Sequence, residues 1–96
     1  EKALTAENRY SPSEQDYLRL VSIYLANKDF VHIANVYEGL IAFNPKNPQY
    51  FASLAAAYAN LGRIDDAVAM ARKTVQVDPS FESEARVFVK SLGREF

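Results

Sequence analysis

The chain has 96 residues, of which 49% are hydrophobic, and its formal net charge at pH 7 is −1. No uninterrupted apolar run reaches the length of about 18 to 20 residues that a membrane span requires, so we expect a soluble segment, cytoplasmic or periplasmic, that does not insert into a membrane. The near-neutral charge argues against nucleic acid as a partner, because nucleic-acid-binding modules usually show a basic surface, and the absence of cysteine excludes disulfides and thiolate metal sites.

The first element in chain order is an N-terminal segment, residues 1–11, which contains too few apolar positions for a complete helix. We expect it to be partly ordered or to form the end of a preceding helix, with Leu4 and Tyr10 packing onto the next element. The chain begins at Glu1 without a methionine or a signal peptide, which indicates a processed product or a piece of a longer protein.

A helix start follows at Ser11-Pro12-Ser13-Glu14. The Ser11 side chain can accept a hydrogen bond from the backbone amide of Glu14, and the Glu14 side chain can accept one from the amide of Ser11. Pro12 fits the first helical position, where its missing donor costs nothing. This capping box predicts a helix over 12–26.

Two antiparallel helices, over 12–26 and 30–43, form the first predicted repeat, residues 12–46, with a turn at 27–29. Apolar residues recur on both helices at spacings of three and four, the period of one helical face, and Pro45 ends the second helix. The inward-facing residues are Tyr17, Leu20, Val21, Tyr24, Phe30, Ile33, Ala34, Tyr37, Leu40 and Ile41.

The second predicted repeat, residues 47–79, has helices over 48–60 and 64–77. Asn47 fits the N-cap of the first of these helices, and Gly62 supplies the positive φ that a left-handed cap between them requires. The inward-facing residues are Phe51, Leu54, Ala55, Tyr58, Ile64, Ala67, Val68, Ala71 and Val75.

The last segment, residues 80–96, is predicted to form a single capping helix over 81–92. Repeat arrays end on a helix that covers the last repeat and turns a polar face outward. We expect Phe88 and Leu92 to make this cover. The residues that they should cover are Leu54, Tyr58 and Val75.

A fixed period relates the two repeats. The pattern Tyr17-x-x-Leu20-Val21-x-x-Tyr24 returns as Phe51-x-x-Leu54-Ala55-x-x-Tyr58, and Pro45 returns as Pro79 at the same offset. A period of about 34 residues indicates stacked supersecondary units, each too small to bury its apolar face alone.

These residues resemble the tetratricopeptide repeat (TPR) family, in which an aromatic residue, a leucine, a small residue and a tyrosine recur on the first helix and a proline closes the repeat. The resemblance spans about residues 13–92. It implies an all-α fold of antiparallel helix hairpins stacked as a right-handed α-solenoid, with two full repeats and a capping helix. The sequence departs from the pattern where Ala71 replaces a large residue and where Val21 and Ile33 replace small ones, which bears on how closely the first two helices approach.

The resemblance also implies a noncatalytic scaffold that binds an extended peptide or a helix of a protein partner in the concave groove lined by the first helices of the repeats. Helical geometry selects side chains on these helices that point away from the partner helix and the neighbouring repeat. The candidate partner-binding residues are Gln15, Leu18, Ser22, Leu25, Gln49, Ala52, Ala56, Asn60, Arg86 and Lys90.

Two zones emerge from this set. The first is an apolar strip suited to the apolar face of a helix, and the second is a basic stripe suited to carboxylates. The strip comprises Leu18, Leu25, Ala52 and Ala56, and the stripe comprises Arg86, Lys90 and Arg94.

Each zone also has a purely structural explanation. The alanines are good helix formers in a tightly packed hairpin. The cations Arg86, Lys90 and Arg94 lie near a helix C-terminus, where the helix dipole favours positive charge, and Glu82 can pair with Arg86 at a spacing of four residues.

Two specialised activities of helical repeats are not expected. The carboxylate clamp that the TPR family uses for chaperone tails needs lysine and asparagine at the positions of Leu18 and Ser22. The related pentatricopeptide repeats read RNA through basic and polar positions, which the charge balance opposes.

Catalytic and metal-binding constellations do not occur in the sequence. The single histidine, His32, has Asp29 three residues before it but no second ligand at metal spacing. The pair Asp65-Asp66 lies in the first turn of a predicted helix, where negative charge offsets the dipole. We therefore expect no enzyme activity, no cofactor and no metal.

Two alternatives stay open at this point. The chain could be an appended soluble TPR domain of a larger enzyme or membrane protein, for example a bacterial envelope glycosyltransferase or polysaccharide ligase. It could also form a homo-oligomer through Tyr10, Tyr17 or Phe30, if the N-terminal segment leaves them uncovered.

Overall fold

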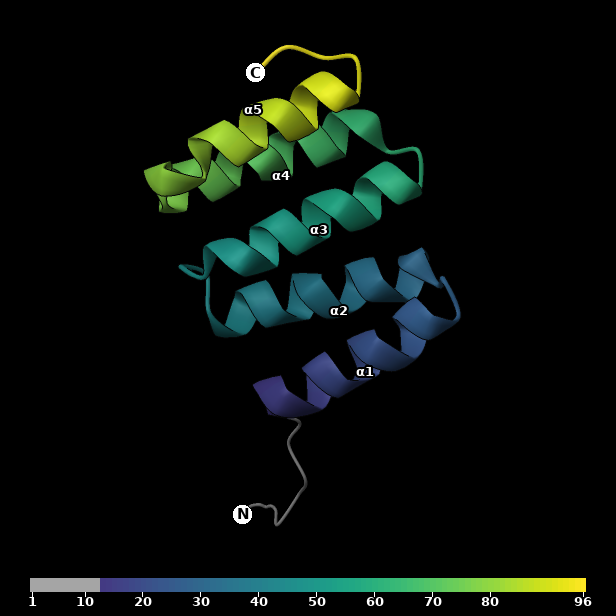
Figure 1. The fold of residues 1–96 in the computed structure, drawn as a ribbon. Coiled ribbons are helices and arrows are strands. Elements are labelled where there is room, and N and C mark those ends of the chain that lie inside the picture. Colours follow the sequence, from purple (N-terminus) through teal and green to yellow (C-terminus); the bar gives the residue numbers. More distant parts are fainter. Residues whose placement is uncertain (1–12) are drawn as a thin grey trace.

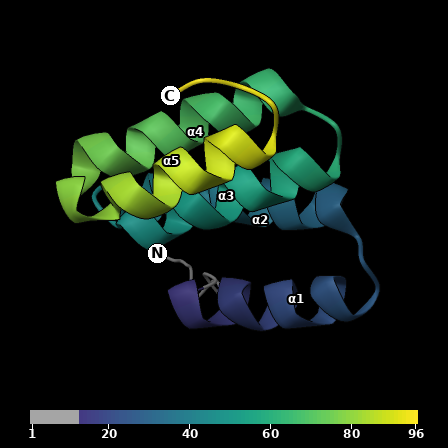
Figure 2. The ribbon, with the colours of Figure 1, turned by 45° about the horizontal axis from the view of Figure 1, so that its top comes forward.

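The structure, a computed structural model, describes residues 13–96, and every regular element in that part of the chain is a helix (Figure 1). The helices are α1 (Glu14–Ala26), α2 (Phe30–Phe43), α3 (Pro48–Asn60), α4 (Ile64–Val77), the short 3₁₀ helix η1 (Pro79–Phe81) and α5 (Glu82–Ser91). Each helix packs against the next one in the sequence, so that α1 and α5 lie at opposite ends of the stack (Figures 1 and 2). The expected all-α helical repeat is confirmed.

The bounds of α2, α3 and α4 agree with the predicted ranges to the residue, whereas the start of α1 does not. The backbone of Ser13 is extended, with ψ 169°, so the helix begins at Glu14 and not at position 12. The capping box is made by Ser13 and Asp16: the Ser13 hydroxyl accepts from the Asp16 amide at 3.3 Å, and the Asp16 carboxylate accepts from the Ser13 amide at 3.0 Å. The prediction for Ser11 lies outside the described residues, as do those for Leu4 and Tyr10.

The sequence assigned the Glu14 side chain to a capping box with Ser11, and in the structure this side chain has a partner on α3. Its carboxylate accepts a hydrogen bond from the Tyr50 hydroxyl at 2.7 Å, which ties the start of α1 to α3. The other departures lie in the last segment, where the chain makes one 3₁₀ turn, η1, at Pro79. The regular helix α5 then runs over Glu82–Ser91 and not over the predicted 81–92.

The core is centred on α3. Leu54, Ala57 and Tyr58 of α3 form one buried cluster with residues of α2 and α4. The members of that cluster from the neighbouring helices are Ile33, Ala34 and Ala67.

Two smaller clusters join other pairs of helices. One joins α4 to α5 through Val68, Ala71, Ala85 and Val89. The other joins α2 to α3 through Val36, Leu40 and Tyr50. Phe88 and Leu92 pack against the cluster that contains Leu54 and Tyr58, as the sequence predicted.

The first repeat is much less buried than the second. Helix α1 contains no fully buried residue, and Leu20, which was predicted to face the core, is 38% exposed. Its counterpart in the second repeat, Leu54, is only 2% exposed, because α2 packs over it. The next pair shows the same contrast, with Ile23 57% and Ala57 2% exposed. Within residues 13–96, nothing covers α1 as α2 covers α3, and for this reason the inward assignment of Leu20 is wrong.

The turns inside the two hairpins share one backbone conformation. Gly62, between α3 and α4, has the predicted positive φ, at 78°. Lys28, which holds the equivalent position between α1 and α2, also has a positive φ, at 55°. A left-handed conformation is strained for a residue with a Cβ atom, so the first hairpin closes at a cost that the second avoids.

Candidate functional site

A hollow of about 350 Å³ lies between α1 and α3, and we call it the α1–α3 groove. Helix α2 contributes to it through Phe30, Ile33 and Tyr37. The residues from the two flanking helices are Val21 and Leu25 of α1 and Ser53, Ala56, Ala57 and Asn60 of α3. None of these side chains is charged, so the groove offers a mainly apolar surface with a few polar atoms in its lining.

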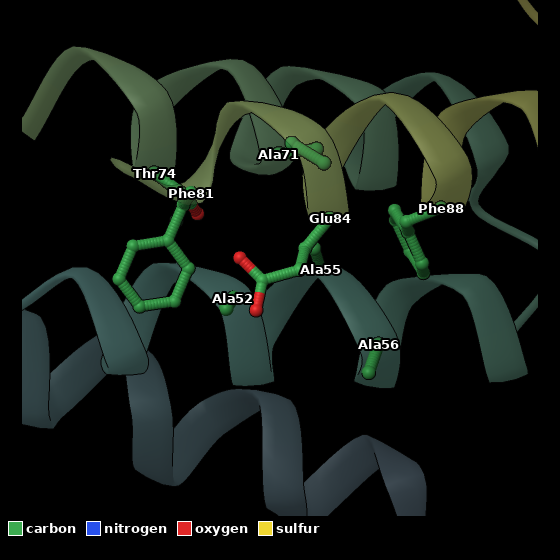
Figure 3. A pocket seen from close by; sticks show the side chains of 9 residues that line it. Ala52, Ala55, Ala56, Ala71, Thr74, Phe81, Glu84 and Phe88 are labelled. Atoms are coloured by element: carbon green, nitrogen blue, oxygen red, sulfur yellow. The ribbon is translucent and has the colours of Figure 1, made fainter. Parts of the chain in front are cut away.

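A second hollow, the α3–α5 pocket, lies between α3, α4 and α5 and has a volume of about 150 Å³ (Figure 3). Its lining residues are Ala52, Ala55 and Ala56 of α3, Ala71 and Thr74 of α4, Phe81 of η1, and Glu84, Ala85 and Phe88 of α5. Ala56 lines both this pocket and the α1–α3 groove, so the two hollows adjoin on one side of α3.

The structure divides the predicted partner-binding residues among these places. Leu25, Ala56 and Asn60 line the α1–α3 groove, and Ala52 lines the α3–α5 pocket together with Ala56. Four others are exposed and line neither hollow: Gln15, Leu18, Ser22 and Gln49.

Arg86 and Lys90 line a separate depression near the C-terminus, with Arg94, Glu95 and Phe96. The α5 side chains that line the α3–α5 pocket are instead Glu84, Ala85 and Phe88. Helical geometry explains this division, because Arg86 lies two residues beyond Glu84 and therefore about 200° around the helix axis.

The basic stripe is largely neutralised by neighbouring groups. Arg86 forms an ion pair with Glu82 at 2.7 Å, as its spacing predicted, and its guanidinium lies 5.1 Å from the centroid of the Phe96 ring. Arg94 pairs with Asp65. Lys90 has no ion-pair partner among residues 13–96, so it carries most of the charge that the stripe could offer to a carboxylate.

Two buried tyrosines of α3 form hydrogen bonds to α1 and α2. The Tyr58 hydroxyl donates to Glu38 of α2 at 2.5 Å, and burial together with this bond raises the pKa of Tyr58 to about 12. The bond from Tyr50 to Glu14 likewise raises the pKa of Tyr50. Both tyrosines are only 7% exposed. Tyr50 was not predicted as a core residue, since the repeat pattern places an aspartate, Asp16, at its equivalent position.

The residues considered for catalysis or metal binding have local partners. His32 Nδ1 lies 2.6 Å from Asp29, and its ring stacks on Tyr24 at a centroid distance of 4.8 Å. Asp66 pairs with Arg63 at 2.9 Å. The described part of the chain contains no group of three or more acidic, histidine or cysteine side chains placed to hold a metal ion. Of the helices between residues 13 and 96, none combines the length and the apolar character needed to cross a bilayer.

Sequence reasoning missed several residues that line the two hollows. Phe30 and Tyr37, which were assigned to the core, do pack against a buried cluster, and they also border the groove. Phe81, Glu84 and Phe88 border the pocket. The alignment of the two repeats contains a usable signal for the pocket, because it matches Ala71 to the large residue Tyr37.

No protein-family model matches the chain. Among curated proteins, it is 29% identical over 76 residues to small glutamine-rich tetratricopeptide repeat-containing protein 2 of Mycosarcoma maydis, covering 73% of this chain and 22% of that protein. It is 39% identical over 57 residues to the protein of the same name from Saccharomyces cerevisiae, covering 59% and 16%. It is 38% identical over 58 residues to human DnaJ homolog subfamily C member 7, covering 60% and 12%.

Among solved structures, the crystal structure of the Sgt2 TPR domain from Aspergillus fumigatus superposes with a TM-score of 0.72 at 23% sequence identity, covering 90% of this chain and 56% of that one. Homologues of the chain are thus TPR-containing proteins, and the structural likeness confirms the helical-repeat fold. The chain spans between 12% and 22% of the length of these curated relatives.

Proposed function

We propose that this helical repeat with TPR-containing homologues is a noncatalytic protein-interaction module that binds a peptide or a helix of its partner in the α1–α3 groove. The observation that carries the proposal is that apolar side chains of α1 in and beside the groove are exposed to solvent. Leu25, which lines it, is 55% exposed, and Leu18, which shares a helical face with Leu25, is 38% exposed. Covering such side chains is favourable by about 25 cal/mol for each Å² removed from water.

The shape and the charge of the groove favour the apolar face of a helix or an extended apolar peptide as its occupant. A helical ligand presents anchors at spacings of three and four residues, which suit an apolar hollow between two helices. The groove has no cationic side chain in its lining, so it does not favour an acidic peptide. The volume of about 350 Å³ falls in the range of ligand-binding pockets.

A pair of matched substitutions tests the groove. Ala56→Glu places a carboxylate in the groove, whereas Ala69→Glu makes the same change at an exposed position on α4. Leu25→Glu is a second groove variant that leaves the α3–α5 pocket untouched.

The partner is first identified with a photoreactive residue at position 25, and its affinity for each variant is then measured by calorimetry. We expect both groove variants to weaken binding at least about tenfold, since a buried unpaired carboxylate is costly. Ala69→Glu should leave the affinity unchanged, and circular dichroism should show that all variants fold. Loss of binding on Ala69→Glu with retention on Ala56→Glu and Leu25→Glu would instead assign the partner to the outer face of the second helices.

A second candidate is that the module acts as an appended domain of a larger enzyme or membrane protein. The observation in its favour is that the similarity covers only a small part of each curated relative, so the matching segment there is one part of a longer protein. These relatives come from fungi and human, and they lend no support to the bacterial examples. Mass spectrometry of the native protein, isolated with an antibody against this segment, would decide between a short chain and a larger one.

A further inference from the structure

The α3–α5 pocket exists because a pair of aromatic rings is missing. At the junction between the first hairpin and α3, Tyr37 and Tyr50 lie together with their ring centroids 6.1 Å apart. The equivalent positions at the junction between the second hairpin and α5 hold Ala71 and Glu84. Both residues line the pocket, so a methyl group and a carboxylate stand where the preceding junction has two packed rings.

The pocket has a buried, apolar wall and an open mouth. Its wall is made by Ala55, Ala71 and Ala85, which are 2%, 3% and 6% exposed, whereas Ala56 and Glu84 at the mouth are exposed. A close-packed interior has few voids larger than a water molecule, and an apolar cavity of this size is large enough for a benzene ring. The volume of about 150 Å³ therefore fits one aromatic side chain.

The negative charge of Glu84 favours a ligand that carries a positive charge near the mouth of the pocket. Figure 3 shows its carboxylate between Phe81 and Phe88, which extend from the α5 side toward α3. Within residues 13–96, that carboxylate makes no hydrogen bond or ion pair. Its place in the first turn of α5 stabilises this negative charge, and because the carboxylate is exposed and has no partner on the described chain, it can pair with a cation carried by a ligand.

We propose that the α3–α5 pocket is an anchor site for an aromatic side chain that the partner carries next to a positively charged group, with the ring seated against Ala55, Ala71 and Ala85 and the cation paired with Glu84. This inference rests on the proposed function, because Ala56 joins the pocket to the α1–α3 groove and one partner segment can occupy both. It adds to that function the chemistry of a single anchoring residue.

The experiment uses the chain labelled with ¹³C on its alanine methyl groups, which report directly on the pocket wall. The probes are 2-phenylethylammonium, which has a ring and a cation, and 2-phenylethanol, which has the ring alone. We expect saturable shifts of the methyl signals of Ala55, Ala71 and Ala85 with both probes, together with nuclear Overhauser contacts from the ring protons. The ammonium probe should bind several-fold more tightly than the alcohol.

Two variants and one matched control separate the ring from the charge. Ala71→Phe restores an aromatic ring at the position of Tyr37 and should weaken both probes at least about tenfold, whereas Ala69→Phe, on the exposed side of α4, should change neither. Glu84→Gln should remove the advantage of the ammonium probe and leave the alcohol unaffected, because only the cation is attracted to a carboxylate.

Shifts that do not saturate, or that fall mainly outside the pocket, would overturn the proposal. If Ala71→Phe fails to fold, the ring contacts in the unmodified chain decide: their absence overturns the proposal, and their presence on the three wall methyl groups supports it. A partner whose binding is lost on Leu25→Glu but unaffected by Ala71→Phe would refute the anchor and leave the proposed function standing.

Discussion

The difference in burial between the two repeats predicts that one substitution will have two very different effects. Leu20 and Leu54 are the same residue type, occupy the same position of consecutive repeats and sit in helices of equal length, yet they are 38% and 2% exposed. We therefore compare Leu20→Ala with Leu54→Ala.

The expected magnitudes follow from the surroundings of each side chain. Leu54 belongs to a cluster with residues of α2 and α4, so its truncation leaves a cavity among three helices and should lower the free energy of unfolding by about 3 to 4 kcal/mol. Leu20 has open space on one side and no fully buried neighbour on its own helix, so its truncation should cost about 1 kcal/mol or less. A domain of this size is stable by only about 5 to 10 kcal/mol, so the first loss is severe.

The assay is urea denaturation followed by circular dichroism, with thermal melting as a second measurement. At about 4 to 8 °C for each kcal/mol, Leu54→Ala should lower the Tm by roughly 12 to 30 °C and Leu20→Ala by a few degrees. Both variants are measured at several protein concentrations, because self-association through the exposed face of α1 would protect Leu20 and make its loss concentration-dependent. Equal and large effects at every concentration would refute the exposure of Leu20 found among residues 13–96.

Three further predictions concern helix α5, the turns inside the hairpins and Tyr58. Phe88 is half-buried, so Phe88→Ala should lower the free energy of unfolding by about 2 to 3 kcal/mol, and an unchanged urea midpoint would show that α5 does not dock as described. Lys28→Gly should raise stability by about 0.5 to 1 kcal/mol by relieving the positive φ, whereas Gly62→Ala should lower it by about 1 kcal/mol, and thermal melting of the two variants should shift in opposite directions. The pKa of Tyr58 is raised to about 12 because burial disfavours the phenolate and the hydroxyl donates to Glu38, so the folded state favours the protonated ring. Its contribution to stability is fully present below pH 10, the ordinary pKa, and is lost as the pH rises toward 12; alkaline unfolding of Tyr58→Phe should lack this loss, and coincident pH curves would contradict it.

The sequence was sufficient for the helices because their signals are local. Spacings of three and four mark each apolar face, Pro45 cannot continue the helix before it, and Gly62 adopts the left-handed conformation at little cost. The structure has α2, α3 and α4 at the predicted bounds. The start of α1 was misplaced because two serines, Ser11 and Ser13, both stand at cap spacing from an acidic residue, and only the backbone of Ser13 shows which one is used.

The hollows required information that periodicity does not contain. A helical face can be read from the sequence, but whether another element covers it cannot, which is why Leu20 was assigned to the core. The side of α5 that turns toward α3 depends on how α5 leaves the turn at η1, and this selects Glu84 and Phe88 in place of Arg86. The contact between Tyr50 and Glu14 joins residues far apart in the sequence and follows from the packing of α1 on α2 and α2 on α3.

The unequal packing of α1 and α3 also means that the two sides of the α1–α3 groove differ in local stability. Helix α3 is firmly packed, whereas we expect α1 to detach from α2 at a low free-energy cost. Helix α3 carries the centre of the core, whereas α1 packs mainly on α2 and has no fully buried residue. Local opening of a helix with few buried contacts requires far less free energy than global unfolding, so backbone amides of α1 should exchange with solvent well before those of α3. If a partner binds against Leu25 as proposed, it requires α1 to be docked, and its apparent affinity is then scaled by the fraction of molecules in which α1 is docked. Substitutions on the α2-facing side of α1, remote from any ligand, can consequently tune affinity through that fraction alone.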